Sequence, residues 1–151
     1  MGVADRLAEL GIELPPVAAP LAAYVPAVRT GNLVHTSGQL PIVAGTLALT
    51  GHVGAEVTVE DATAAARTCA LNALAAVDAL VGLDAVVRVV KVVGFVASAP
   101  GFTGQPAVVN GASNLLGDVF GEAGVHARSA VGAAELPNGA PVEVELIVEV
   151  R

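Results

Sequence analysis

The sequence predicts a single α+β domain, and three segments carry that prediction. Residues 58–80 are rich in alanine and repeat apolar positions every three or four residues, which is typical of a helix packed against a sheet. Residues 85–97 are dense in valine, a β-branched residue that favours strands. Residues 142–150 alternate aliphatic side chains with glutamates over most of their length, the two-residue period of a strand with one buried face. A chain of 151 residues suits one domain with one core.

The chain begins with a predicted short helix followed by an irregular arm. The helix covers residues 3–10 and ends at Gly11, because its apolar residues fall at helical spacing: Val3, Leu7 and Leu10. Residues 15–26 are rich in proline and alanine and predict an arm without regular structure.

A β-hairpin follows the arm. Its predicted strands are residues 27–30 and 33–36, and they flank Gly31-Asn32, a dipeptide with hairpin-turn chemistry. Between Gly38 and Gly54 several glycines alternate with short aliphatic runs, which predicts a loop with one more short strand.

The long helix opens with a capping pattern, Thr58 followed three residues later by Asp61, and closes at Gly82. Its apolar stripe is predicted to face the sheet and consists of Ala62, Ala66, Cys69, Ala73, Val77 and Leu80. Because Cys69 falls in this stripe, we expect it to be a small core residue with an inert thiol.

The second half of the chain predicts a sheet that is covered on both sides. The strand at residues 85–97 is apolar on each face. A second helix spans about residues 106–121, with a buried set of Val109, Leu115, Leu116, Val119 and Phe120. Two helices can cover only one face of such a sheet, so we expect the other face to pack on further subunits.

Composition excludes several classes of function. The chain has a net charge of −7 and no basic run, which disfavours nucleic acid as a partner. No uninterrupted apolar run approaches the roughly 18 residues needed to cross a bilayer, and the N-terminus lacks a secretory signal, so we expect a cytoplasmic protein without membrane insertion. A single cysteine excludes an internal disulfide framework, and the glycines form no phosphate-binding fingerprint, so no nucleotide cofactor is expected.

The most informative charges lie on the last two predicted strands, residues 128–134 and 142–150, which a turn at residues 136–139 joins. Charged residues make up only 14% of the chain, so a lone arginine before an aliphatic run is a candidate anion anchor. The guanidinium of Arg128 can grip a carboxylate through two parallel hydrogen bonds. The alternative is an ion pair with Glu143 or Glu145 on a neighbouring strand.

Glu143 is the second candidate for chemistry. A glutamate can act as a general base when partial burial raises its pKa. The alternative is a solvated carboxylate on the surface of a strand.

The histidines and serines give no strong indication of a metal site or a catalytic triad. His35, His52 and His126 lack the spacing of a zinc site, and no metal is expected. His126 precedes Arg128 by two residues and could edge the same pocket, although we expect a surface histidine. Ser37 and Ser129 have no visible His/Asp partners for a hydrolase triad.

Three motifs in order resemble the Rid family, the YjgF-like reactive-intermediate imine deaminases. They are Gly31-Asn-Leu-Val-His-Thr-Ser-Gly-Gln-Leu-Pro41, Val109-Asn110, and Arg128-Ser-Ala-Val followed by Leu-Pro-Asn-Gly-Ala-Pro-Val-Glu143-Val-Glu. The likeness covers about residues 17–151, which we expect to form the Rid-like domain, with residues 1–16 as an N-terminal helical extension outside it.

The resemblance implies a chorismate-mutase-like fold with a mixed sheet, two long helices on one face, and a trimeric barrel-like assembly with ligand sites between subunits. It implies that Arg128 holds the carboxylate of a 2-imino acid and that Glu143 activates water. Tyr24, Ser37, Asn110 and Ser129 would line the pocket. The implied activity is hydrolytic deamination of reactive 2-imino or enamino acids, produced by pyridoxal-phosphate enzymes, to 2-oxo acids and ammonia.

The sequence departs from the usual deaminase pattern in three places. The segment at residues 42–57 is longer than is typical, Ala130 stands where Cys or Thr is common, and an N-terminal helix is present. These features resemble a longer, poorly characterised branch of the family. Two further hypotheses therefore stay open: non-catalytic binding of a small carboxylic acid in the same cleft, and RNA cleavage, which the acidic charge disfavours.

Overall fold

A computed structural model describes residues 2–19 and 22–151. A five-stranded sheet in the order β1-β2-β7-β5-β6 forms the centre, and a separate two-stranded ribbon joins β3 and β4. All pairs are antiparallel except β5 with β6, which makes the main sheet mixed. The elements are α1 (Val3–Glu9), β1 (Ala27–Thr30), β2 (Leu33–Thr36), β3 (Ile42–Val43), β4 (Thr46–Leu47), α2 (Val59–Val81), β5 (Val86–Ala97), α3 (Gln105–Phe120), β6 (Ala127–Ala133) and β7 (Val142–Val150), with short 3₁₀ turns at Leu83–Ala85, Gly121–Gly124 and Pro137–Gly139.

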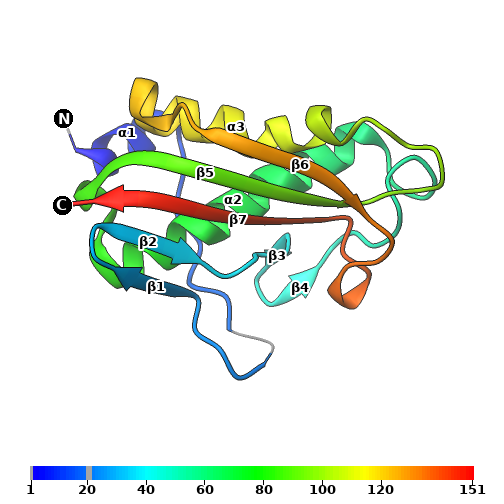
Figure 1. The fold of residues 1–151 in the computed structure, drawn as a ribbon, viewed down its shortest axis with the longest axis horizontal. Helices are drawn as coiled ribbons and strands as arrows, with labels where there is room; N and C mark the ends of the chain where they lie inside the picture. Colours follow the sequence, from blue (N-terminus) through cyan, green and yellow to red (C-terminus); the bar gives the residue numbers. More distant parts are fainter. Residues whose placement is uncertain (1, 20–21) are drawn as a thin grey trace.

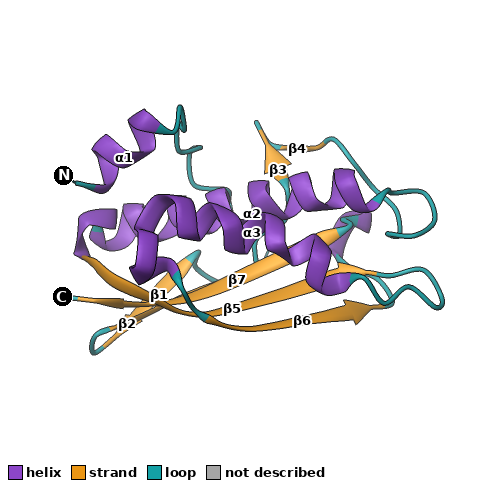
Figure 2. Cartoon of the chain, turned by 90° about the horizontal axis from the view of Figure 1, so that it is seen from above, coloured by secondary structure: helices purple, strands orange, loops and turns teal. Residues whose placement is uncertain are grey.

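Both long helices lie on one face of the sheet, as predicted, and none of the described residues forms a helix on the opposite face (Figure 2). The chain therefore has the α+β architecture that the sequence predicts. The leading helix and the first hairpin are also confirmed. The loop after Gly38 differs from prediction, because it holds two short strands rather than one.

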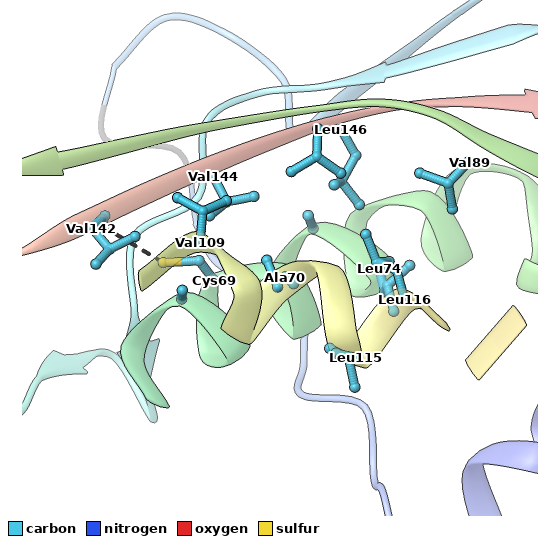
Figure 3. Packing of buried hydrophobic residues seen from close by; sticks show 14 of the residues in the cluster. Cys69, Ala70, Leu74, Val89, Val109, Leu115, Leu116, Val142, Val144 and Leu146 are labelled. Carbon is cyan, nitrogen blue, oxygen red and sulfur yellow. Dashed lines mark hydrogen bonds between the residues drawn. The ribbon is translucent and has the colours of Figure 1, made fainter. Parts of the chain in front are cut away.

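The core fills the space between the helices and the sheet (Figure 3). The predicted stripe of α2 is fully buried from Ala62 to Val77, and the Cys69 thiol points at the carbonyl of Val142. Burial raises the pKa of Cys69 well above its ordinary value, so the thiol stays protonated. Leu80 is a correction: it is 46% exposed, because it lines a surface pocket with Val25 and Pro26 of the arm rather than packing in the core.

The length and composition of α2 would also suit a membrane span, but more than half of its most apolar window is buried inside the protein. Its side chains pack on β7 and on α3. We therefore assign α2 as a core helix of the domain.

The close approach of α3 to α2 depends on Gly111. A Cβ at this position would collide with the backbone carbonyl of Thr63, which cannot move aside as a side chain can. We expect Gly111→Ala to destabilise the protein by about 1–3 kcal/mol through overpacking. Urea unfolding at one fixed protein concentration measures the effect.

Gly117 on the same helix is the matched control. A Cβ there meets nothing within 4 Å. Gly117→Ala should stabilise the protein by about 0.5–1 kcal/mol, because alanine loses less backbone entropy in a helix. Equal shifts for the two variants would show that the helix contact at Gly111 does not limit packing.

The order of the last strands corrects a second expectation. β6 and β7 follow each other in the sequence, but they do not pair, because β5 lies between them (Figure 1). The parallel pair β5 and β6 is connected through α3, the usual crossover for parallel strands. This crossover places α3 above the edge strand β6, which matters for Arg128.

Candidate functional site

Arg128 lies on β6, at the edge of the sheet, with its side chain on the face that the helices cover. Its pairing partner Val92 is fully buried on that face. Nη1 donates to Asn110 Oδ1 at 2.7 Å and to Ser113 Oγ at 3.2 Å. Nη2 donates to the carbonyl of Pro106 at 3.3 Å. The first three turns of α3 therefore hold the guanidinium.

Every one of these acceptors is neutral. Within the described part of the chain, the ion pairs are Arg6 with Glu9 and His52 with Glu56 and Glu135, and Arg128 takes part in none of them. The alternative of an ion pair with Glu143 or Glu145 is therefore wrong, because β5 separates β6 from β7. The three bonds use three of the five N–H donors of a guanidinium, so Nε and Nη2 each keep one N–H for a ligand.

Glu143 lies on β7, and its side chain is on the face without helices. Its neighbours in the alternation, Val142 and Val144, are fully buried on the other face. No hydrogen bond or ion pair joins its carboxylate to any residue in the ranges 2–19 and 22–151. A Cβ at Gly38 would collide with Oε1, so the carboxylate lies directly against the backbone of Gly38.

The environment of Glu143 favours its protonated form. Partial desolvation raises the pKa of this carboxyl above its ordinary value, and the negative charge of Glu145 raises it further. A carboxylate that is half-buried and lacks a partner contributes nothing evident to stability. Such groups are functional candidates.

Arg128 and Glu143 do not meet within one chain. Their strands are separated by β5, which amounts to about 10 Å at the usual strand spacing. Their side chains also lie on opposite faces of the sheet, since Arg128 pairs across with Val92 and Glu143 with Phe95. A single small molecule cannot contact both groups in one protomer.

The arm lies beside Glu143 rather than beside Arg128. Ser37 Oγ donates to the carbonyl of Val25 at 2.6 Å, and its N–H donates to the carbonyl of Pro26. These bonds hold the end of the arm, at Val25 and Pro26, against Ser37. Tyr24, the preceding residue of the arm, is 46% exposed. Tyr24 lines a pocket with Gly38 and Gln39 whose volume of about 30 Å³ has room for one or two water molecules.

The predicted site residues thus form two groups. Asn110 joins Arg128, while Tyr24 and Ser37 lie near Gly38, which contacts Glu143. Ser129 lies next to Arg128 in the chain, but its pairing with Val93 directs its side chain to the other face. The group around Arg128 could bind the carboxylate of a substrate, and the group around Glu143 could accept a proton.

One residue near Arg128 was not singled out from the sequence, and a second was assigned to the wrong environment. Ser113 contacts the guanidinium, and its spacing of three residues from Asn110 on a helix is the signal that could have found it. His126 is a correction, because it is partly buried and hydrogen-bonded to Ser113 rather than a free surface side chain.

No metal-binding group emerges from the described residues. Residues 2–19 and 22–151 contain no cluster of three or more His, Cys, Asp or Glu side chains arranged to hold an ion. His52, which contacts Glu56 and Glu135, lies in a separate surface pocket with Ser98.

Comparison with known proteins places the chain in a family. The model of the family described as "YjgF/chorismate_mutase-like, putative endoribonuclease" matches residues 4–150. Protein TCP17 of Trypanosoma cruzi is 51% identical over 99% of this chain and 94% of its own length. The crystal structure of protein Atu1372 from Agrobacterium tumefaciens is 50% identical with a TM-score of 0.91, covering 99% of this chain and 92% of that one. E. coli TdcF, solved with bound serine, is 27% identical with a TM-score of 0.63, covering 91% and 94%.

The match of the family model extends over nearly the whole chain, and the mixed sheet with two helices on one face is the fold of its relatives. The chain belongs to the YjgF/chorismate-mutase-like family.

Proposed function

We propose that this protein hydrolyses 2-imino acids and their enamine tautomers to 2-oxo acids and ammonia, at sites formed between subunits, as a member of the Rid branch of its family. The observation that carries the proposal is the separation of two complementary groups. Arg128 offers an anion anchor on one edge of the sheet, and Glu143 offers an unpaired carboxylate beside the arm. A second copy of the chain would bring the two groups to one ligand.

The helix-free face of the sheet supports this assembly. Large apolar side chains are exposed on it, among them Val28 at 53%, Leu33 at 37% and Val131 at 45%. Burying such a face against other copies would stabilise an oligomer. The proposed state is a homotrimer, in which the β6 edge of one subunit meets the arm and Gly38 of the next.

In the proposed reaction the carboxylate of the substrate binds the two remaining donors of Arg128. Glu143 accepts a proton from a water molecule while the water oxygen forms a bond to the imine carbon, and the electron pair of the C=N bond moves to nitrogen. The proton then passes to nitrogen in the tetrahedral intermediate. This gives a neutral intermediate that carries one hydroxyl and one amino group. Glu143 then takes the hydroxyl proton and passes it to the nitrogen, the C–N bond breaks as the C=O bond forms, and ammonia leaves.

Two further observations support the proposal. TdcF was solved with bound serine, a small molecule that carries the carboxylate proposed for the substrate here. The raised pKa of Glu143 suits a general base that works near neutral pH. Tyr24, Ser37 and Ser129 are proposed pocket residues, and the proposal places the enzyme in the cytoplasm without a metal or an organic cofactor.

A coupled assay tests the activity. Threonine dehydratase generates 2-iminobutyrate in the assay mixture, and release of 2-oxobutyrate is followed with and without the protein. We expect faster release than the buffer rate, together with a trimer mass in light scattering. If the protein adds nothing to the buffer rate but binds 2-oxobutyrate, the chain is a binding module instead. Cleavage of a labelled RNA by the protein would contradict the proposal.

Gly38 offers a prediction about Glu143 that leaves the titratable groups untouched. A methyl group at this position must displace the Glu143 carboxylate, which can move because it ends a flexible side chain. We expect Gly38→Ala to lower kcat by about 10-fold or more through misplacement of the base, with little change in melting temperature. Gly117→Ala, on α3 where an added methyl group meets nothing within 4 Å, is the control and should keep the wild-type kcat. If Gly38→Ala keeps the wild-type kcat, Glu143 does not take part in the reaction as its base.

A further inference from the structure

A chain of hydrogen bonds lies behind Arg128, on the side away from its unused donors. His126 Nδ1 is 2.6 Å from the carbonyl oxygen of Gly124, and His126 Nε2 is 2.9 Å from Ser113 Oγ. Ser113 Oγ in turn is 3.2 Å from Arg128 Nη1. The backbone, an imidazole and a hydroxyl are thus connected in series to the guanidinium.

The direction of each bond follows from the two ends of the series. A carbonyl oxygen can only accept, so His126 Nδ1 carries a proton and donates it to Gly124. In the neutral imidazole Nε2 is then an acceptor, and the Ser113 hydroxyl donates to it. The single hydroxyl proton of Ser113 is used in this way, so only its lone pairs face Arg128.

These residues converge from two different parts of the chain. Ser113 lies three residues after Asn110 on α3, so both side chains reach the same side of the helix and share Nη1. His126 lies in the short link between the 3₁₀ turn Gly121–Gly124 and β6. The series therefore ties the anchor to the helix and to the entry of its own strand at once.

We propose that Ser113 and His126 are positioning residues, which hold the Arg128 guanidinium in the orientation that presents Nε and Nη2 to a carboxylate. This inference rests on the proposed function of Arg128 as the anchor. Because both protons of Nη1 are used in hydrogen bonds, the planar group cannot turn freely. Ligand binding therefore does not carry the entropy cost of ordering the guanidinium. Without His126, the Ser113 hydroxyl is free to rotate its proton towards the guanidinium and repel it.

The test compares Ser113→Ala and His126→Ala with wild type. We expect each to weaken binding of 2-oxobutyrate by about 10-fold, the loss expected for one hydrogen bond to a charged group. KM should rise by a similar factor, while kcat stays within about 3-fold. Ser113→Thr, which keeps the hydroxyl, should restore wild-type binding. Asn114→Ala, at the exposed neighbouring position of α3, is the control and should change neither value.

A double-mutant cycle separates positioning from a general structural effect. In the Arg128→Ala background, Ser113→Ala should cause no further loss of 2-oxobutyrate binding, because its effect passes through the guanidinium. Losses that add independently would overturn the inference, as would wild-type binding in Ser113→Ala. If the wild type binds 2-oxobutyrate but shows no turnover, the proposed activity is wrong. The double-mutant cycle on 2-oxobutyrate binding then still tests the positioning role of Ser113. Wild type that does not bind it overturns both.

Discussion

Arg128→Ala is expected to lower kcat/KM for 2-iminobutyrate by about 100-fold or more. Removing the guanidinium removes the charged donors that orient the substrate, and losing a hydrogen-bonded charge partner costs about 2–5 kcal/mol. Most of this loss should fall on KM, because the carboxylate is bound in the ground state and the transition state alike. The coupled release of 2-oxobutyrate measures both constants.

Two further variants make this result specific. Arg128→Lys keeps the charge but replaces the planar fork with a single ammonium group, so it should recover only part of the loss. Arg67→Ala removes an exposed arginine of α2 and changes the net charge by the same amount. It should retain wild-type kinetics. If Arg67→Ala lowers activity as much as Arg128→Ala, general electrostatic attraction explains the effect and Arg128 is no anchor.

Local patterns in the sequence predicted the elements well, because each depends on nearby residues. The alternation of β7 places Val142, Val144 and Leu146 in the core, and Thr58 Oγ1 caps α2 by accepting from the N–H of Asp61. The strand order could not be read in the same way. Insertion of β5 between β6 and β7 depends on long-range pairing, which leaves no trace in the turn that joins the two strands.

The candidate site shows the same division. Asn110 and Arg128, which the resemblance assigns to one pocket, are hydrogen-bonded to each other in the structure. The placement of Glu143 on the opposite face from Arg128 was missed, because it depends on the register in which both strands pair with β5, and this long-range register cannot be read from the local sequence. Ser113 was missed for another reason: it matches no motif, and only its contact in space shows that it belongs with the arginine. His126 was placed beside Arg128 from its position two residues earlier, but its partial burial and its hydrogen bond to Ser113 were not predicted.

Glu143→Gln is expected to lower kcat by about 100-fold or more, the usual contribution of a positioned general base. The amide has nearly the same shape but cannot accept a proton from water. In wild type, kcat should rise with pH as Glu143 loses its proton and reach a plateau above its raised pKa. A profile of kcat between pH 4 and pH 8, about the range in which a perturbed glutamate titrates, measures this limb.

The same substitution should make the protein more stable at neutral pH. Burial raises the folded-state pKa of Glu143, so its contribution to stability is fully present below the unfolded-state pKa and is lost as pH rises through the folded-state value. Above that pH the wild type carries a half-buried charge that Glu143→Gln lacks. The melting temperature of the variant should therefore exceed that of wild type at pH 7, and the difference should vanish in acid.

Glu145→Gln is the matched control on the same strand and face. The charge of Glu145 raises the pKa of Glu143, so its removal should shift the rising limb of the kcat profile to lower pH while the plateau stays within about 3-fold of wild type. The two glutamates then have different effects on the kcat profile. Glu143 sets the height of its plateau, and Glu145 sets the pH at which kcat rises. A plateau that falls equally in both variants would contradict the assignment of Glu143 as the base, because simple loss of negative charge from the sheet would account for it.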